Sequence, residues 1–168
     1  MAKEKYDIEK ELAKWLKGAE RVVIVGIGNP IRMDDYVGVK IVQDLQGKVS
    51  DRVVLIEAET VPESYLHEII DFKPTHILLI DAAIQGLKPG ETGLAKANEL
   101  KSSPVFSTHM LPLRLFCEQL SETVETEIYF LLIEPKATDF GEGMTSEIDN
   151  LAQRVTKTLV AVLQSSLL

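Results

Sequence analysis

The chain has 168 residues, 45% of them hydrophobic, which is enough for one domain with a full core. With 18 Lys and Arg against 26 Asp and Glu, the net charge of −8 argues against nucleic-acid binding and a polybasic membrane anchor. One cysteine excludes an internal disulfide, no apolar run is long enough to span a membrane, and the first residues do not look like a secretion signal. We therefore expect one cytoplasmic domain over residues 1–168, with residues 1–20 as an N-terminal helical extension.

Strand and helix signals alternate along the chain. An N-terminal helix is predicted from Ile8, Leu12 and Trp15, which fall on one face. Buried strands are predicted from short apolar runs at residues 21–26, 52–57, 76–81 and 127–133, and a weaker edge strand at 93–96. Such nearly continuous apolar runs are typical of a parallel sheet covered on both faces.

The segments between the strands show helical spacing of apolar residues. The predicted stripes are Val37, Ile41 and Leu45; Leu66, Ile69 and Ile70; Leu113, Phe116, Cys117 and Leu120; and Ile148, Leu151, Val155, Leu159 and Val162. The pattern predicts a three-layer α/β sandwich, with a mostly parallel, twisted sheet of about five strands and helices on both faces. In such folds, ligands bind beyond the carboxyl ends of the strands, where the strand order reverses.

The loop after the first strand begins with a Gly26-x-Gly28 pattern. A dinucleotide fold would require a third glycine where Ile31 stands, and Pro30 removes a backbone N–H that a phosphate would use, so we expect no nucleotide cofactor. Asp34 and Asp35 then precede a helix. We expect Asp34 to cap that helix, which leaves Asp35 to face the cleft.

Two later residues are candidates for the same cleft. Asp81 closes an apolar strand, where an acid suits the cleft better than the core, although it could also be a solvated strand end. His109 is expected in the first turn of a helix, where the helix dipole favours a neutral imidazole that can bind a metal. A lone histidine is more often structural. Two carboxylates and an imidazole could nevertheless form an open metal site.

From about Val22 to Leu163 the chain resembles the endopeptidases that mature the large subunit of nickel–iron hydrogenases. The resemblance rests on Gly26-x-Gly28-Asn29 through Asp35 and Gly38, on Leu79-Ile80-Asp81-Ala82, on Thr108-His109-Met110-Leu111-Pro112-Leu113, and on Ile133-Glu134-Pro135. The Thr-His-x-x-Pro-Leu form looks most like the branch that serves formate- or ferredoxin-linked multisubunit hydrogenases.

The resemblance implies a function and a site. Matched position by position, Asp35, Asp81 and His109 would be the metal ligands and the catalytic residues. The protein would recognise nickel already inserted in the immature large subunit and would then remove a short C-terminal extension from it. The metal would be nickel carried by this substrate. The precursor would be the partner, and we expect a monomer without nucleic-acid or membrane partners.

One stretch departs from the family pattern. Where the family commonly has Asp-Gly-Gly-Thr after the second strand, this chain has Glu57-Ala58-Glu59-Thr60, so a positive φ there would be costly. Cys117 lies on an apolar stripe and is expected to be buried and inert. Two alternative functions are a metal-sensing chaperone or binding module that does not cleave, and a small α/β hydrolase acting on a small amide or ester.

Overall fold

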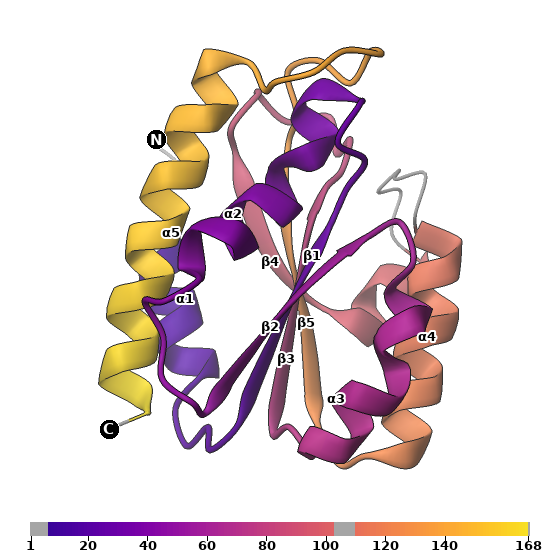
Figure 1. Ribbon diagram of the computed structural model, residues 1–168, viewed down its shortest axis with the longest axis vertical. Coiled ribbons are helices and arrows are strands. Elements are labelled where there is room, and N and C mark those ends of the chain that lie inside the picture. Colours follow the sequence, from indigo (N-terminus) through magenta and orange to yellow (C-terminus); the bar gives the residue numbers. More distant parts are fainter. Residues whose placement is uncertain (1–6, 103–109, 168) are drawn as a thin grey trace.

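The computed structural model describes residues 7–102 and 110–167 (Figure 1). The helices are α1 (Ile8–Trp15), α2 (Val37–Leu45), α3 (Leu66–Phe72), α4 (Met110–Thr123) and α5 (Ser146–Ser166). Short 3-10 helices occur at η1 (Met33–Tyr36), η2 (Pro62–Tyr65) and η3 (Ala97–Ser102). The strands are β1 (Val22–Ile27), β2 (Val53–Glu59), β3 (His76–Ala82), β4 (Thr92–Lys96) and β5 (Glu127–Ile133).

The five strands form one sheet in the order β2-β1-β3-β5-β4. The β1–β2, β1–β3 and β3–β5 pairs are parallel, whereas β4 pairs antiparallel with β5. Every residue of β1 and β3 is buried, as expected for central strands covered on both faces. The predicted strands, including the weak edge strand, are therefore confirmed.

Helices cover both faces of the sheet, which confirms the predicted three-layer sandwich (Figure 1). One core lies under α1, α2 and α5, and the second lies under α3 and α4. The first core includes Leu12, Trp15 and Leu16, so the N-terminal helix packs into the domain. None of the helices in the described part of the chain is long and apolar enough to cross a membrane.

The strand order reverses between β1 and β3. The chain leaves β1 for β2 on one side and then returns to β3 on the other. In folds of this kind the ligand-binding crevice lies at such a switch point, here beyond the carboxyl ends of β1 and β3. Two glycines allow the next segment to approach this edge. A Cβ at Gly28, where φ is +153°, would collide with the Asp35 carbonyl, and one at Gly38 would collide with the carbonyl oxygens of Ile27 and Ile80.

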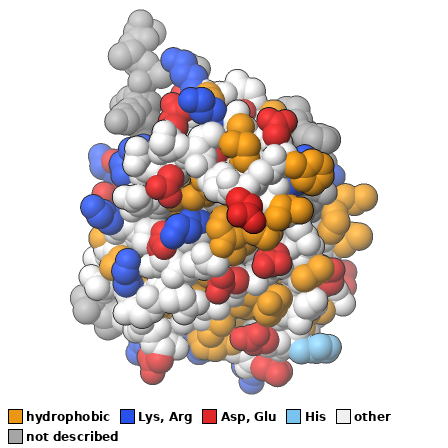
Figure 2. Space-filling view, turned by 45° about the horizontal axis from the view of Figure 1, so that its top comes forward, with side chains coloured by type: hydrophobic (Ala, Val, Ile, Leu, Met, Phe, Trp, Pro, Cys, Tyr) orange, Lys and Arg blue, Asp and Glu red, His pale blue; other side chains and the backbone are white. Residues whose placement is uncertain are grey.

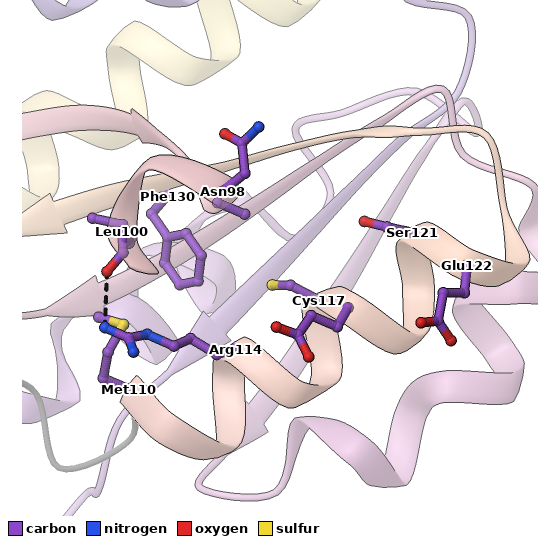
Figure 3. Close-up of a pocket in the computed structure, with 10 residues that line it drawn as sticks. Asn98, Leu100, Met110, Arg114, Cys117, Ser121, Glu122 and Phe130 are labelled. Atoms are coloured by element: carbon purple, nitrogen blue, oxygen red, sulfur yellow. Dashed lines mark hydrogen bonds between the residues drawn. The ribbon is translucent and has the colours of Figure 1, made fainter. Parts of the chain in front are cut away.

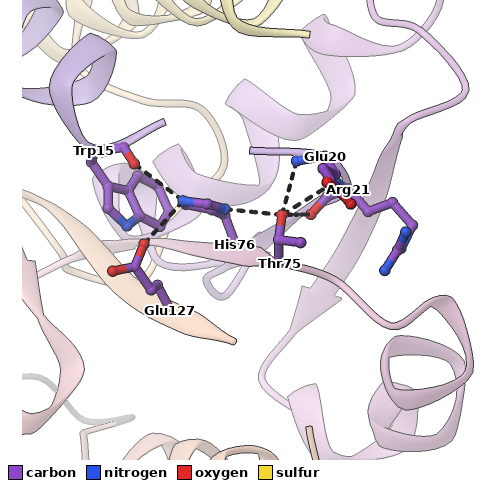
Figure 4. A network of polar contacts seen from close by, with 6 residues as sticks. All are labelled: Trp15, Glu20, Arg21, Thr75, His76 and Glu127. Atoms are coloured by element: carbon purple, nitrogen blue, oxygen red, sulfur yellow. Dashed lines mark hydrogen bonds and ion pairs between the residues drawn. The ribbon is translucent and has the colours of Figure 1, made fainter. Parts of the chain in front are cut away.

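At the opposite, amino end of the sheet, a polar network ties α1 to β3 (Figure 4). The buried His76 ring contacts the Trp15 carbonyl through Nε2 at 3.1 Å and Thr75 Oγ1 through Nδ1 at 3.0 Å. The same Nε2 lies 3.0 Å from a carboxylate oxygen of Glu127 at the start of β5. Burial lowers the pKa of His76, and the Glu127 carboxylate opposes that shift.

Candidate functional site

Asp35 lies in η1, directly beyond the end of β1, and is 8% exposed. Its Oδ2 accepts a hydrogen bond from the backbone N–H of Asn29 at 2.9 Å, and the Asn29 side chain accepts one from the N–H of Ile31 at 3.1 Å. The loop between β1 and η1 therefore folds around the Asp35 carboxylate and fixes its orientation. Asp35 thus lies beside the carboxyl end of β1, and its role as a ligand in the crevice stays a prediction.

Asp81 is the penultimate residue of β3 and is completely buried. Its neighbours in the strand are apolar, and it pairs across the sheet with Leu132 of β5. Gly38, three residues after Asp35, packs directly on the Ile80 carbonyl. The structure thus brings the segments that carry Asp35 and Asp81 together at the carboxyl edge of β1 and β3.

The third predicted ligand, His109, lies outside the described residues. Helix α4 begins at the next residue, Met110, and Pro112 lies in its first turn, where a missing N–H is tolerated. Within residues 7–102 and 110–167, no three His, Cys, Asp or Glu side chains lie close enough together to hold a metal ion. Of the three predicted ligands, the described residues include the carboxylates of Asp35 and Asp81. Carboxylate oxygens are suitable ligands for a divalent cation.

Asp34 does not cap the helix that follows it, so that prediction is wrong. The N-cap of α2 is Tyr36, without a side-chain hydrogen bond, and Asp34 is completely buried beneath the loop between β5 and α5. Its Oδ2 accepts from the N–H groups of Lys136 and Ala137 at 3.0 and 2.9 Å. Its Oδ1 accepts from the N–H of Thr145 at 2.8 Å and lies 3.0 Å from the Thr145 hydroxyl.

Backbone hydrogen bonds tie the same two loops together beside Asp35. The N–H of Met33 donates to the Gly141 carbonyl at 3.1 Å, and the N–H of Gly141 donates to the Ile31 carbonyl at 2.9 Å. Arg32 Nε donates to the Thr138 carbonyl at 3.2 Å, while its guanidinium carbon lies 5.5 Å from the centre of the Phe140 ring. Residues 31–35 are therefore held in place by the loop that follows β5.

Glu134, directly after β5, is a second buried acid that fixes a loop. Its carboxylate accepts from the N–H of Gln85 at 2.7 Å, and its carbonyl accepts from the N–H of Gly90 at 2.9 Å. Glu134 is 6% exposed and thus anchors the segment that follows Asp81. Its anchoring role was not predicted from the sequence. The feature of the sequence that could have indicated it is an acid placed directly between a buried strand and Pro135.

The Glu57-Ala58-Glu59-Thr60 stretch keeps a left-handed residue although it lacks glycine. Glu59 has a φ of +51°, and its carbonyl accepts a hydrogen bond from the N–H of Gly28 at 2.8 Å. The register between β1 and β2 shifts at this point. Glu57 is exposed, and its carboxylate accepts from the Gln43 side chain at 2.7 Å. Glu59 therefore adopts the left-handed conformation, despite its energetic cost, at the point where β2 ends.

Cys117 is buried, as expected. Burial raises the pKa of its thiol to about 12, so a thiolate nucleophile is disfavoured. The residue lines a pocket of about 370 Å³ between α4, η3 and β5 (Figure 3). Arg114 crosses one end of this pocket and donates to the Leu100 carbonyl at 2.8 Å.

Comparison with known proteins gives the family to which the chain and its fold belong. Residues 39–163 match the hydrogenase maturation protease family. A protein of Methanocaldococcus jannaschii that carries a provisional name as a hydrogenase maturation protease is 33% identical over 157 residues, or 89% of this chain and 92% of the relative. The hydrogenase 3 maturation protease of Escherichia coli K12 is 28% identical over 82% of this chain and 87% of its own length.

Solved structures agree with this result. The crystal structure of the [NiFe] hydrogenase maturation protease HycI from Thermococcus kodakarensis superposes with a TM-score of 0.84 and 31% identity, covering 92% of this chain and 99% of that one. The hydrogenase-maturating endopeptidase HybD from E. coli gives 0.74 at 19% identity, covering 87% and 93%, and supports the fold alone. The chain belongs to the hydrogenase maturation protease family, as the resemblance in its motifs implied.

Proposed function

We propose that this protein is an endopeptidase that removes the C-terminal extension of an immature nickel–iron hydrogenase large subunit after nickel insertion. In this proposal the nickel belongs to the substrate and acts as the recognition element. Asp35, Asp81 and His109 are the residues that contact it. The protein would act as a monomer in the cytoplasm.

The observation that carries the proposal is the position of the two carboxylates. Asp35 and Asp81 come from different strand connections, yet both are buried at the point where the strand order reverses. A buried acid in the core is costly, so two at a ligand-binding edge favour a functional role. Family membership adds that the chemistry of this class is proteolysis.

The residues of this chain would bind and orient the substrate. The Asn29 N–H holds the Asp35 carboxylate in one orientation, and the surrounding strand holds Asp81. When bound, nickel would polarise a carbonyl or a water molecule. A site with oxygen and nitrogen ligands from few protein residues leaves coordination positions for the ligands of the substrate itself. Cys117 supplies no competing nucleophile, because its thiol is buried and protonated.

The test is the intact mass of a hydrogenase large-subunit precursor after incubation with the protein, with and without inserted nickel. We expect loss of one C-terminal fragment from the nickel-loaded precursor alone. Asp35→Ala, Asp81→Asn and His109→Ala should abolish cleavage, whereas Asp51→Asn, an exposed acid before β2 at the opposite end of the sheet, should not. Wild-type cleavage by the three site variants would disprove the assignment. Binding without cleavage by the wild-type protein would favour the non-cleaving binding module.

A further inference from the structure

Large apolar side chains are exposed on the face that surrounds the crevice. Phe140 is 81% exposed, Ile31 and Ile84 are 50% exposed, and Val61 and Leu87 are 45% and 43% exposed. Each of the five follows the carboxyl end of a parallel strand: β1, β2, β3 or β5. We call these five residues the apolar rim. Isolated exposed apolar residues are ordinary, but a group around one edge indicates an interaction site.

Figure 2 shows how side chains are distributed when this end of the molecule is turned forward. Hydrophobic side chains gather on one half of the face with acidic side chains among them, and most Lys and Arg lie on the other half. Exposed acids adjoin the rim in sequence at Glu59, Glu63, Asp139 and Glu142. An acidic polypeptide would be repelled from this surface, whereas an apolar one, neutral or basic, would be accepted.

The rim residues are held on anchored loops. Phe140 packs on the Arg32 guanidinium, and its neighbour Gly141 is hydrogen-bonded to Ile31 and Met33. Ile84 directly precedes Gln85, and Leu87 lies two residues after it. The N–H of Gln85 donates to the Glu134 carboxylate. Loops whose backbone is already fixed lose little conformational entropy when a partner covers them.

We propose that the apolar rim binds the segment of the precursor next to the cleaved bond, through apolar side chains of that segment. The inference rests on the proposed function, because a polypeptide that reaches Asp35 and Asp81 has to cross this rim. The rim acts in substrate selection, and the carboxylates act in the chemistry. A contact of this kind should weaken little when salt screens the acidic residues.

The test compares KM and kcat for cleavage of the nickel-loaded precursor by the full chain. We expect Phe140→Ser and Val61→Ser each to raise KM at least about five-fold, with kcat at saturation within about two-fold of wild type. Phe140→Leu should restore most of the affinity. Val124→Ser, a half-buried apolar position before β5 at the opposite end of the sheet, is the matched control and should leave KM unchanged. Repeating the measurement in 0.5 M salt should preserve the difference.

The outcomes separate this inference from the proposed function. If the wild-type protein cleaves and the rim variants keep the wild-type KM, the rim inference is wrong while the protease assignment stands. If the wild-type protein binds without cleaving, the same comparison is made with dissociation constants, and loss of binding in the rim variants supports the inference. If the rim instead joins two copies of this chain, the wild-type protein dimerises and Phe140→Ser makes it monomeric, which overturns the proposal.

Discussion

The carboxylate of Asp34 accepts hydrogen bonds from the backbone N–H of Thr145 and contacts its hydroxyl, although the two residues are 111 positions apart in the chain. Thr145 is the N-cap residue of α5. One buried side chain therefore joins the loop that carries Asp35 to the start of the last helix. The crevice is built by contacts between distant segments, and its geometry depends on this junction.

Removing the Asp34 charge should destabilise the fold. In Asp34→Asn an amide N–H₂ would face N–H groups that now donate to a carboxylate, and we expect a loss of about 2 kcal/mol in the free energy of unfolding. Thr145→Val should cost about 1 kcal/mol, because it removes the hydroxyl and keeps the backbone N–H. Urea unfolding would measure both. Asp139→Asn is the exposed control, and an equal loss in it would show that the effect is not specific to the junction.

Glu59→Gly should stabilise the protein. A non-glycine residue in the left-handed region costs about 1–2 kcal/mol, and glycine avoids that cost at the expense of a more flexible unfolded chain. We expect a net gain of about 0.5–1 kcal/mol in thermal or urea unfolding. Glu57→Gly is the control: Glu57 lies inside β2 and has no positive φ, so glycine should destabilise there. A destabilised Glu59→Gly variant would show that the Glu59 side chain stabilises the fold in another way.

Stability should fall as the pH drops below neutrality because of His76. Its pKa in the folded protein lies below the ordinary value of 6.5, so between these two values the unfolded chain binds the proton more readily. The contribution of the neutral ring is therefore complete above about pH 6.5 and is lost as the pH falls toward the lower pKa. Stability curves of the wild-type protein and His76→Gln should converge over this range.

Two variants sharpen the His76 experiment. His67→Gln removes an exposed histidine and should leave the wild-type pH dependence intact. Glu127→Gln removes the carboxylate that opposes the shift, so the folded-state pKa of His76 should fall further and the loss should extend to lower pH. A pH dependence that is identical in wild type and His76→Gln would refute the account.

Cys117 should be unreactive in the folded protein. Its thiol is buried and has a pKa of about 12, so iodoacetamide should modify it only after unfolding. Cys117→Ser should therefore retain cleavage of the precursor, apart from any effect of lower stability. Mass spectrometry after alkylation at neutral pH, with and without urea, measures the modification. Rapid labelling of the native protein, together with loss of cleavage, would indicate a thiol mechanism.

The fold could be predicted because its elements are encoded locally. The apolar runs of β1 and β3 indicate burial on both faces, and the shorter, mixed segment at residues 93–96 indicates an edge. The positions of Asp35 and Asp81 near one edge of the sheet could be predicted because the carboxyl ends of parallel strands meet there, whereas their role as ligands stays a prediction.

What the sequence could not indicate concerns partners that are distant along the chain. Asp34 precedes a helix, so local capping was the natural expectation, but its partners lie in the loop after β5 and no local pattern points to them. Glu59 has a positive φ because the β1–β2 register shifts there, and the residue type alone gave no sign of it. Long-range hydrogen bonds determined both outcomes.

The Asp34–Thr145 junction also has a consequence for the order of events during synthesis. Asp34 emerges from the ribosome 111 residues before Thr145, a delay on the order of 10 s at common translation rates. During that time β1, β2 and β3 can pair, while the Asp34 carboxylate has no Thr145 to hold and the loop around Asp35 is not yet clamped. A nascent chain should therefore complete the loop around Asp35 only when the start of α5 has emerged.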